Sequence, residues 1–178
     1  MDYLFQSERL GFRNWQPADI HPLASLCADP EVMRYFLNPL GKEQTESLLE
    51  KINSQFDQYG YGPYAVEQLD GGTFIGFIGF AYCDMDADFA PCTEILWRLS
   101  KAYWGHGYAP EGAQACIDYG RSKHGIEEIY SFTATLNTPS ERVMQKIGMV
   151  KEGEFDHPNV PDGHDLKRHV LYSSKLKV

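Results

Sequence analysis

The stretch YWGHGYAPEGAQACIDYG, residues 103–120, decides the fold. Gly105 and Gly107 permit backbone conformations and close approaches that a Cβ would hinder. Pro110 suits a first helical position, where its missing N–H has no cost. Apolar residues then recur at the three- and four-residue spacing of one buried helix face, at Ala109, Ala113, Cys116, Ile117 and Gly120. The pattern predicts a glycine loop followed by a helix that runs to about Lys123.

The start of this helix is a candidate anion site. Its first turn presents unpaired backbone N–H groups and the positive end of the helix dipole, so a phosphate would fit there. An ordinary glycine-containing turn is the alternative, because short glycine motifs also occur by chance. The dinucleotide motif G-x-G-x-x-G needs a third glycine where Pro110 stands. The phosphate loop G-x-x-x-x-G-K-[ST] does not occur in the sequence.

Composition narrows the class of protein. With 178 residues, 43% hydrophobic and 13% aromatic, we expect one folded domain over residues 1–178. A net charge of -9 argues against nucleic-acid binding, which needs a basic surface. The same negative charge favours cationic partners. The longest uncharged apolar-rich run, FIGFIGFAY at 74–82, is too short to span a membrane. We therefore expect a soluble cytoplasmic protein that does not bind membranes.

No metal site or disulfide framework is predicted. The four cysteines, at 27, 83, 92 and 116, show no C-x-x-C spacing and are expected to be reduced thiols. Asp84, Asp86 and Asp88 imitate the start of a calcium loop, but the later loop positions lack the required glycine and glutamate. The histidines and aspartates of segment 156–169 show no metal-ligand spacing either.

Periodicity and turn residues predict mixed helices and strands. Proline at 17 opens a helix over 17–27, and a second helix lies between Gly41 and Gly60. A further helix begins at Thr138 as N-cap, with Pro139 first, and ends at Gly148. Strands are expected at 9–13, 63–69, 73–82, 93–99, 129–136 and 168–176. Alternation makes 129–136 a half-buried strand whose apolar set is Tyr130, Phe132, Ala134 and Leu136.

These elements predict a single α/β domain with a mixed, mostly antiparallel sheet. The segments 63–69 and 73–82 are joined by the turn signal DGG and read as an antiparallel hairpin. The middle of the chain is strand, glycine loop, helix and strand, a β-α-β unit whose loop directs a helix N-terminus at an anion.

The motifs ERLGFRNWQPADI, TEILWRLSKAYWGHGYAPEG and NTPSERVMQKIGMV, in this order, resemble the GNAT N-acetyltransferases. The resemblance covers nearly the whole chain and is greatest to the ribosomal-protein N-terminal alanine acetyltransferases. It implies a central sheet with a splayed strand pair, and acetyl-CoA as co-substrate. Trp104 stands where the general family loop has Arg or Gln, as it does in this branch; the loop acts through backbone N–H groups, so phosphate binding is not threatened.

The resemblance also implies which residues hold the coenzyme. The loop and the following helix start hold the pyrophosphate, the preceding strand pairs with pantetheine, and the Asn137 region flanks the sulfur. The implied set is Trp97, Arg98, Leu99, Trp104, Gly105, His106, Gly107, Tyr108, Ala109, Asn137, Arg142 and Lys146.

Acetyl transfer to an amine defines three catalytic needs. The amine is mostly protonated at neutral pH, so a base is useful, and Glu94 is the candidate because related enzymes carry a glutamate at this strand position. The alternative, which has equal weight, is that Glu94 is only a structural residue of the strand that faces solvent. A backbone N–H near Leu96 or Trp97 could stabilise the oxyanion. Ser140 could protonate the leaving thiolate, or be only a first-turn serine. Asn137 is a further candidate, since the capping box is complete without it, although loop asparagines are often only turn residues.

The acceptor is a primary amine, such as a protein N-terminus or a small molecule. We expect direct transfer in a ternary complex, because no cysteine lies in a recognised nucleophile setting beside a histidine. Segment 155–172 is expected to form a wall of the acceptor cleft, and a homodimer is common in the resembled family. The competing interpretation is a non-catalytic acyl-CoA-binding or sensing module of the same fold.

Overall fold

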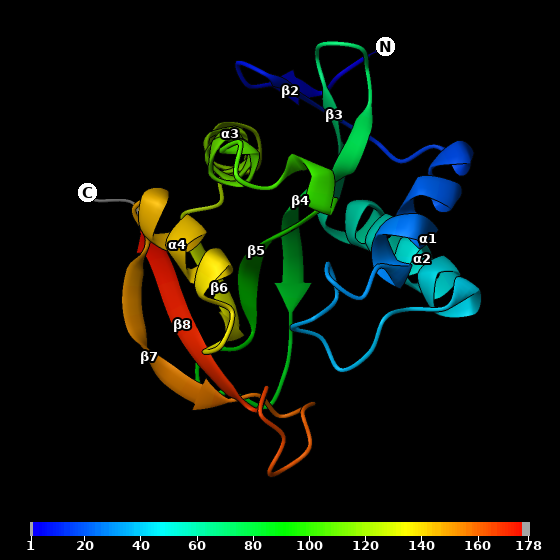
Figure 1. Cartoon of the computed structure of the whole chain (residues 1–178). Coiled ribbons are helices and arrows are strands. Elements are labelled where there is room, and N and C mark those ends of the chain that lie inside the picture. Colours follow the sequence, from blue (N-terminus) through cyan, green and yellow to red (C-terminus); the bar gives the residue numbers. More distant parts are fainter. Residues whose placement is uncertain (1, 176–178) are drawn as a thin grey trace.

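A computed structural model describes residues 2–175, which contain one eight-stranded sheet in the order β1-β2-β3-β4-β5-β6-β8-β7 (Figure 1). The strands are β1 (Phe5–Gln6), β2 (Leu10–Arg13), β3 (Pro63–Gln68), β4 (Phe74–Cys83), β5 (Cys92–Leu99), β6 (Glu128–Ala134), β7 (Val150–Asp156) and β8 (Arg168–Lys175). The helices are α1 (Ile20–Ala28), α2 (Lys42–Tyr59), α3 (Tyr108–His124) and α4 (Thr138–Lys146), with 3-10 turns η1 (Pro17–Asp19) and η2 (Lys101–Tyr103). Within this described sheet, β5 and β6 run parallel and the other neighbours antiparallel. The predicted fold class is confirmed.

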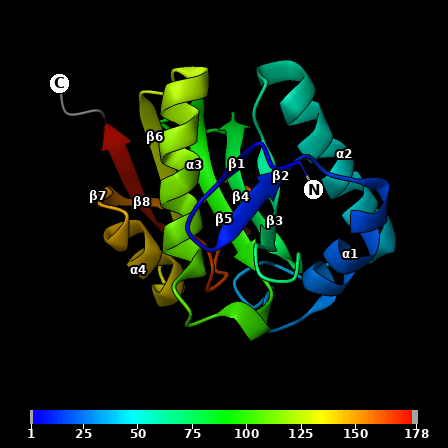
Figure 2. The same ribbon diagram turned by 90° about the horizontal axis from the view of Figure 1, so that it is seen from above.

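The helices cover the two faces of the sheet in pairs. Figures 1 and 2 show α1 and α2 together on one side of the central strands and α3 with α4 on the other. Because side chains alternate along a strand, β5 contributes to both layers. Leu96 packs into the cluster beneath α1 and α2, which contains Leu23, Leu26 and Cys27. Ile95 belongs to the larger core beneath α3, which contains Ile117.

Several predicted boundaries are confirmed. Helix α2 begins directly after Gly41 and ends at Gly60, whose φ of 75° is the left-handed cap that glycine favours. Strands β3 and β4 form the predicted antiparallel hairpin. The predicted final strand corresponds to β8, and its last predicted residue, 176, lies outside the described residues. The predicted helix 17–27 is η1 followed by α1. No helix found within residues 2–175 is long and apolar enough to cross a membrane.

Two helix starts were predicted wrongly. Helix α3 begins at Tyr108 with Gly107 as its N-cap, so Pro110 is the third helical residue. Proline is tolerated there because the first-turn N–H groups have no partner within the helix. Helix α4 is capped by Asn137 and not by Thr138. The asparagine side chain reaches the N–H of the third helical residue, so the capping argument that freed Asn137 for catalysis is wrong.

Strand β6 does not have the predicted single buried face. Ile129 and Ser131 are buried, while Leu136, predicted to be inward, lies beyond the strand and is 54% exposed. Phe132 packs on Phe89 and Phe155 on the opposite face. Both faces are therefore covered, and simple alternation could not identify the core side. Strands β1 and β7 were also not predicted; the first is two residues long, and the second is mostly polar.

Candidate active site

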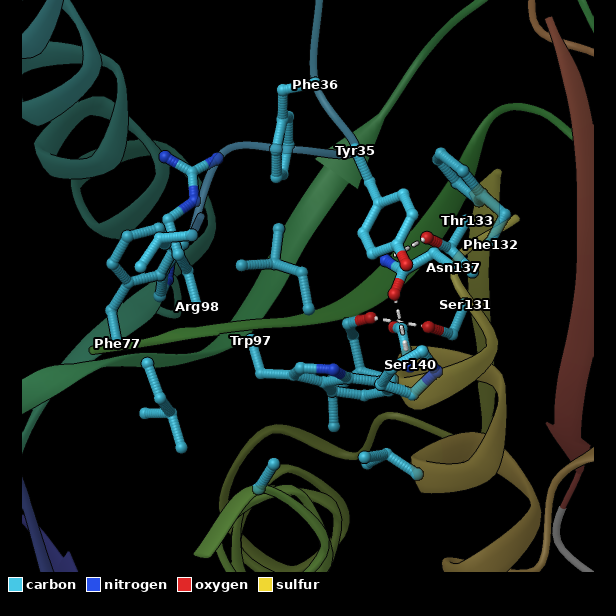
Figure 3. A pocket seen from close by; sticks show the side chains of 18 of the residues that line it. Tyr35, Phe36, Phe77, Trp97, Arg98, Ser131, Phe132, Thr133, Asn137 and Ser140 are labelled. Carbon is cyan, nitrogen blue, oxygen red and sulfur yellow. Dashed lines mark hydrogen bonds between the residues drawn. The ribbon is translucent and has the colours of Figure 1, made fainter. Parts of the chain in front are cut away.

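A pocket of about 830 Å³ opens where β5 and β6 separate. The two strands share one register pair, Glu94 with Tyr130. Beyond it, the Ser131 hydroxyl donates a hydrogen bond of 3.0 Å to the carbonyl of Ile95, so a side chain replaces the missing backbone ladder. Figure 3 shows this serine at the edge of the pocket. The splayed strand pair thus provides an opening through the sheet, with α1 and α2 on one side of it and α3 and α4 on the other.

The glycine loop forms one end of the pocket. Gly105 and Gly107 both have φ near 80°, at 78° and 81°, a conformation that side chains with a Cβ rarely adopt. The first-turn N–H groups of α3 follow directly, and Gly105, Gly107, Tyr108 and Ala109 line the pocket. The Trp104 indole donates to the carbonyl of Leu99 at 2.8 Å, which ties the loop to the end of β5. The loop geometry is that of an anion site at a helix start.

Arg9 braces this loop from a distant part of the chain. Its guanidinium donates to the carbonyl of His106 at 3.1 Å and forms an ion pair of 2.6 Å with Glu111 in the first turn of α3. Its guanidinium carbon also lies 4.5 Å from the ring centre of Tyr108. Sequence analysis missed Arg9, because no local pattern connects residues 97 positions apart. His106 itself is not among the residues that line the pocket, so its predicted coenzyme contact would be through the backbone.

Strand β5 presents its predicted residues to the two sides of the opening. Glu94, Leu96 and Arg98 share the face that α1 and α2 cover, while Trp97 and Leu99 share the face of α3. Figure 3 shows Arg98 and Trp97 projecting in opposite directions from the strand. All five residues line the pocket. The pocket therefore has a half on the α3 and α4 side and a half on the α1 and α2 side.

Glu94 is partly buried in the wall of the second half. Burial raises the pKa of its carboxyl to about 8, and the neighbouring Cys83 adds to that effect. No hydrogen bond from the described residues stabilises its charged form. A carboxyl with this pKa gains and loses a proton near physiological pH, which suits general acid–base chemistry. The solvent-facing alternative is not favoured by this position.

Asn137 and Ser140 meet at the start of α4. The Asn137 side chain accepts a hydrogen bond from the Ser140 backbone N–H at 3.3 Å and donates one to the Thr133 hydroxyl at 2.9 Å. Asn137 thus joins β6 to α4. The Ser140 hydroxyl forms no hydrogen bond within the described residues, and Ser140 lines the pocket together with Trp97 (Figure 3). Its hydroxyl is therefore available to a molecule bound on this side of the pocket.

The charge of the pocket differs from that of the whole protein. Its described lining includes five cationic side chains and two carboxyl groups, namely Arg34, Lys51, Arg98, Arg142, Lys146, Glu31 and Glu94. The net charge of the chain is -9, so the cations are concentrated here. The sequence-based expectation of cationic partners does not extend to this pocket, which favours anionic ligands.

Segment 157–169 closes the pocket next to β6. The residues of this segment that line it include His157, Asn159, Val160 and His169, so the segment forms a wall of the pocket. The His169 ring packs 4.8 Å from that of His157. Burial lowers the pKa of both, that of His169 to about 4. Both imidazoles are therefore neutral at physiological pH and contribute no charge to this wall.

Comparisons with known proteins identify the family. The family description "Acetyltransferase (GNAT) domain" matches residues 9–150. The chain belongs to the GNAT acetyltransferase family. It is 30% identical over 167 residues to the uncharacterized N-acetyltransferase YnaD of Bacillus subtilis (strain 168), covering 94% of each chain. A GNAT-family acetyltransferase from Bacillus anthracis matches its structure with a TM-score of 0.77 at 28% identity, covering 96% of each chain.

A second structural comparison supports the same fold. The ribosomal-protein-S5-alanine acetyltransferase of Vibrio fischeri matches with a TM-score of 0.72, covering 98% of this chain and 97% of the other. At 19% identity, this likeness establishes the shared fold alone. The GNAT fold accounts for the splayed strands and the glycine loop, while the choice of acceptor depends on residues particular to this chain.

Proposed function

We propose that the protein transfers an acetyl group from acetyl-CoA to a primary amine by direct attack in a ternary complex. The observation that carries the proposal is the opening between β5 and β6, which has the glycine loop and the start of α3 at one end and Glu94 at the other. A coenzyme with a phosphate end and a thioester end fits an opening whose two ends differ in this way. The α3 and α4 half would hold the coenzyme and the opposite half the acceptor.

The phosphate end would be held by backbone and by cations. The N–H groups around Gly107 and Tyr108 face an anion at the helix start, and Arg142 and Lys146 of α4 add positive charge to the pocket lining. Trp97, Leu99, Trp104, Gly105 and Ala109 complete the proposed coenzyme contacts. Asn137 supports this half from the side by joining β6 to α4.

The thioester carbonyl would be polarised by β5. The carbonyl of Ile95 points toward β6, since it accepts from Ser131. Peptide groups alternate in direction along a strand, so the N–H of Trp97 points the same way, into the opening. Of the two candidates from the sequence, Trp97 is therefore the better oxyanion donor. An N–H fixed in this way stabilises the charge that develops in the transition state without a reorganisation cost.

Each half of the pocket would contribute one residue to proton transfer. The amine nitrogen attacks the carbonyl carbon, the C–S bond breaks and the coenzyme leaves as a thiolate. The ionised form of Glu94, whose fraction increases as the pH rises toward 8, takes the proton from the amine, directly or through water. The Ser140 hydroxyl donates its proton to the departing sulfur and regains one from solvent. No cysteine is among the described residues that line the pocket, which supports direct transfer over a covalent acetyl-enzyme.

Release of free thiol tests the proposal. Purified protein is incubated with acetyl-CoA and a panel of peptides and small amines, and thiol and acetylated product are both measured. Acceptor-dependent, equimolar formation of the two supports the proposal. Saturable coenzyme binding without turnover on any amine would favour the acyl-CoA-binding or sensing module. Cytoplasmic localisation and a homodimer remain parts of the proposal; fractionation and sedimentation would test them.

A further inference from the structure

Arg98 lies in the acceptor half without an anionic partner. Its guanidinium carbon is 4.3 Å from the ring centre of Phe36 and 5.1 Å from that of Phe77. One terminal nitrogen donates a hydrogen bond of 3.2 Å to the sulfur of Cys27. The Nε atom is buried and has no hydrogen-bond partner. Within residues 2–175 no carboxylate forms an ion pair with this side chain.

An unpaired cation in this setting is unfavourable for the free protein. Buried charges are normally paired and hydrogen-bonded, because removal from water is costly. Desolvation lowers the pKa of Arg98, which shows that its surroundings disfavour the charge. The two aromatic rings offset part of this cost through cation–π contact, and a thiol is a weak acceptor. Figure 3 shows the side chain at the pocket wall beside Phe36 and Phe77, where a bound anion could supply the missing partner.

The position of Arg98 assigns that anion to the acceptor. Its side chain is on the α1 and α2 face of β5, opposite to Trp97 and to the proposed coenzyme half. The helix start at Gly107 is the separate site proposed for the phosphate end of the coenzyme. Arg98 was predicted to bind the coenzyme because of its place in the motif; the direction of its side chain favours the acceptor instead.

The other charges of the acceptor half support this assignment. Two further cations line the pocket, Lys51 of α2 and Arg34 in the segment that joins α1 to α2. Glu31 is already paired with Lys101 at 3.3 Å. Glu94 has a pKa of about 8 and is therefore largely neutral at pH 7. A second cationic group on an acceptor, as in a polyamine, would meet net positive charge.

We propose that the acceptor is a primary amine that also carries a carboxylate several bonds away, and that Arg98 binds this carboxylate. Positions 94 and 98 are four residues apart on one face, about 13 Å along a strand. The intervening Leu96 provides an apolar surface for the linking chain. This inference rests on the proposed acetyltransferase function and specifies its acceptor.

A matched set of acceptors tests the role of Arg98. The set comprises ω-amino carboxylates of increasing length, their uncharged ω-amino amides and the corresponding diamines. The readout is the ratio of kcat/KM for acid over amide at each length. We expect a ratio of about 10 to 100 in the parent, mostly through KM, as for a hydrogen-bonded charge pair. The ratio should fall to near one in Arg98→Met and recover partly in Arg98→Lys.

Lys42→Met is the matched control, since it removes an exposed cation of α2 that does not line the pocket. It should change the ratio by less than about twofold. A parent that acetylates amides or diamines as well as acids would overturn the assignment of Arg98 while leaving the proposed function intact. An equal effect of Arg98→Met on all three acceptor classes would also overturn it, as the mark of a purely structural arginine.

Binding without turnover gives an independent measurement. In the presence of CoA, the ω-amino acids should raise the melting temperature of the parent more than the amides do, and Arg98→Met should abolish that difference. Equal shifts for acids and amides would contradict the proposal. If acids bind selectively through Arg98 but no acceptor is acetylated, the carboxylate site stands and the proposed transferase activity fails.

Discussion

Replacement of Glu94 by glutamine should make the protein more stable and less active. The folded carboxyl has a pKa of about 8, against an ordinary value of 4.5. The folded state therefore binds this proton more tightly than the unfolded state. The stabilisation of the folded protein by this tighter proton binding is complete below pH 4.5 and is lost as the pH rises through about 8. Glutamine resembles the protonated form at every pH, so the advantage of Glu94→Gln should grow over this interval and then remain constant.

The size of the effect follows from the two pKa values. The difference 8 − 4.5, at 1.36 kcal/mol per pKa unit, gives an upper limit of about 5 kcal/mol. The residue is only partly buried at the pocket wall, and solvent screening reduces the value, so we expect about 1 to 2 kcal/mol. For a chain of this size that corresponds to a melting temperature about 3 to 6 °C higher.

The assay combines melting curves at pH 5 and pH 8.5 with initial rates across the same range. The gain in melting temperature should appear at pH 8.5 and nearly vanish at pH 5. At pH 7 the rate should fall by about 10²-fold, with partial recovery at higher pH, where the acceptor amine loses its own proton. The control is Glu127→Gln at an exposed position, which should change neither quantity. Parental rates and parental stability of Glu94→Gln at both pH values would refute the reasoning.

Three further predictions concern the glycine loop and the start of α4. Gly107→Val should raise the KM for acetyl-CoA at least about tenfold, because φ is 81° there; Gly125→Val has similar strain, at φ 65°, at the far end of α3 and should lower stability without this KM effect. Ser140→Ala should lower kcat by about 10²-fold with a parental melting curve, since its backbone N–H and not its hydroxyl bonds Asn137; parental turnover would remove the hydroxyl from the mechanism. Asn137→Ala should cost about 1 kcal/mol of unfolding free energy through the lost cap, measured by denaturation, and Thr138→Ala less; the reverse order would contradict the observed cap.

Local signals in the sequence predicted much of the fold. Gly41 and Gly60 bracket α2, and the glycine loop precedes α3, because these features depend on residues within a few positions of each other. The order of motifs also predicted the GNAT family. The single buried face of β6 was predicted wrongly because its second face is covered by aromatic residues from distant segments, Phe89 and Phe155.

The candidate site was predicted less completely, for a similar reason. Glu94 and Ser140 both line the pocket, but their chemical roles remain predictions. The role of Asn137 in capping α4 was hidden because two adjacent residues, Asn137 and Thr138, are both good N-caps. Two features depend on tertiary contacts, namely the contact of Arg9 with the glycine loop and the lack of an anionic partner for Arg98. No spacing in the sequence predicts either of them.

The most direct test of the central claim is the stoichiometry of acetyl transfer. Acetyl-CoA is mixed with the protein and an amine panel that includes ω-amino carboxylates, and free thiol is measured together with the mass of the acceptor. The account predicts one acetylated amine for each thiol released, at a rate that depends on the acceptor and falls in both Glu94→Gln and Gly107→Val. Coenzyme binding that is weakened by Gly107→Val, with no acceptor-dependent thiol release from any amine, would contradict it.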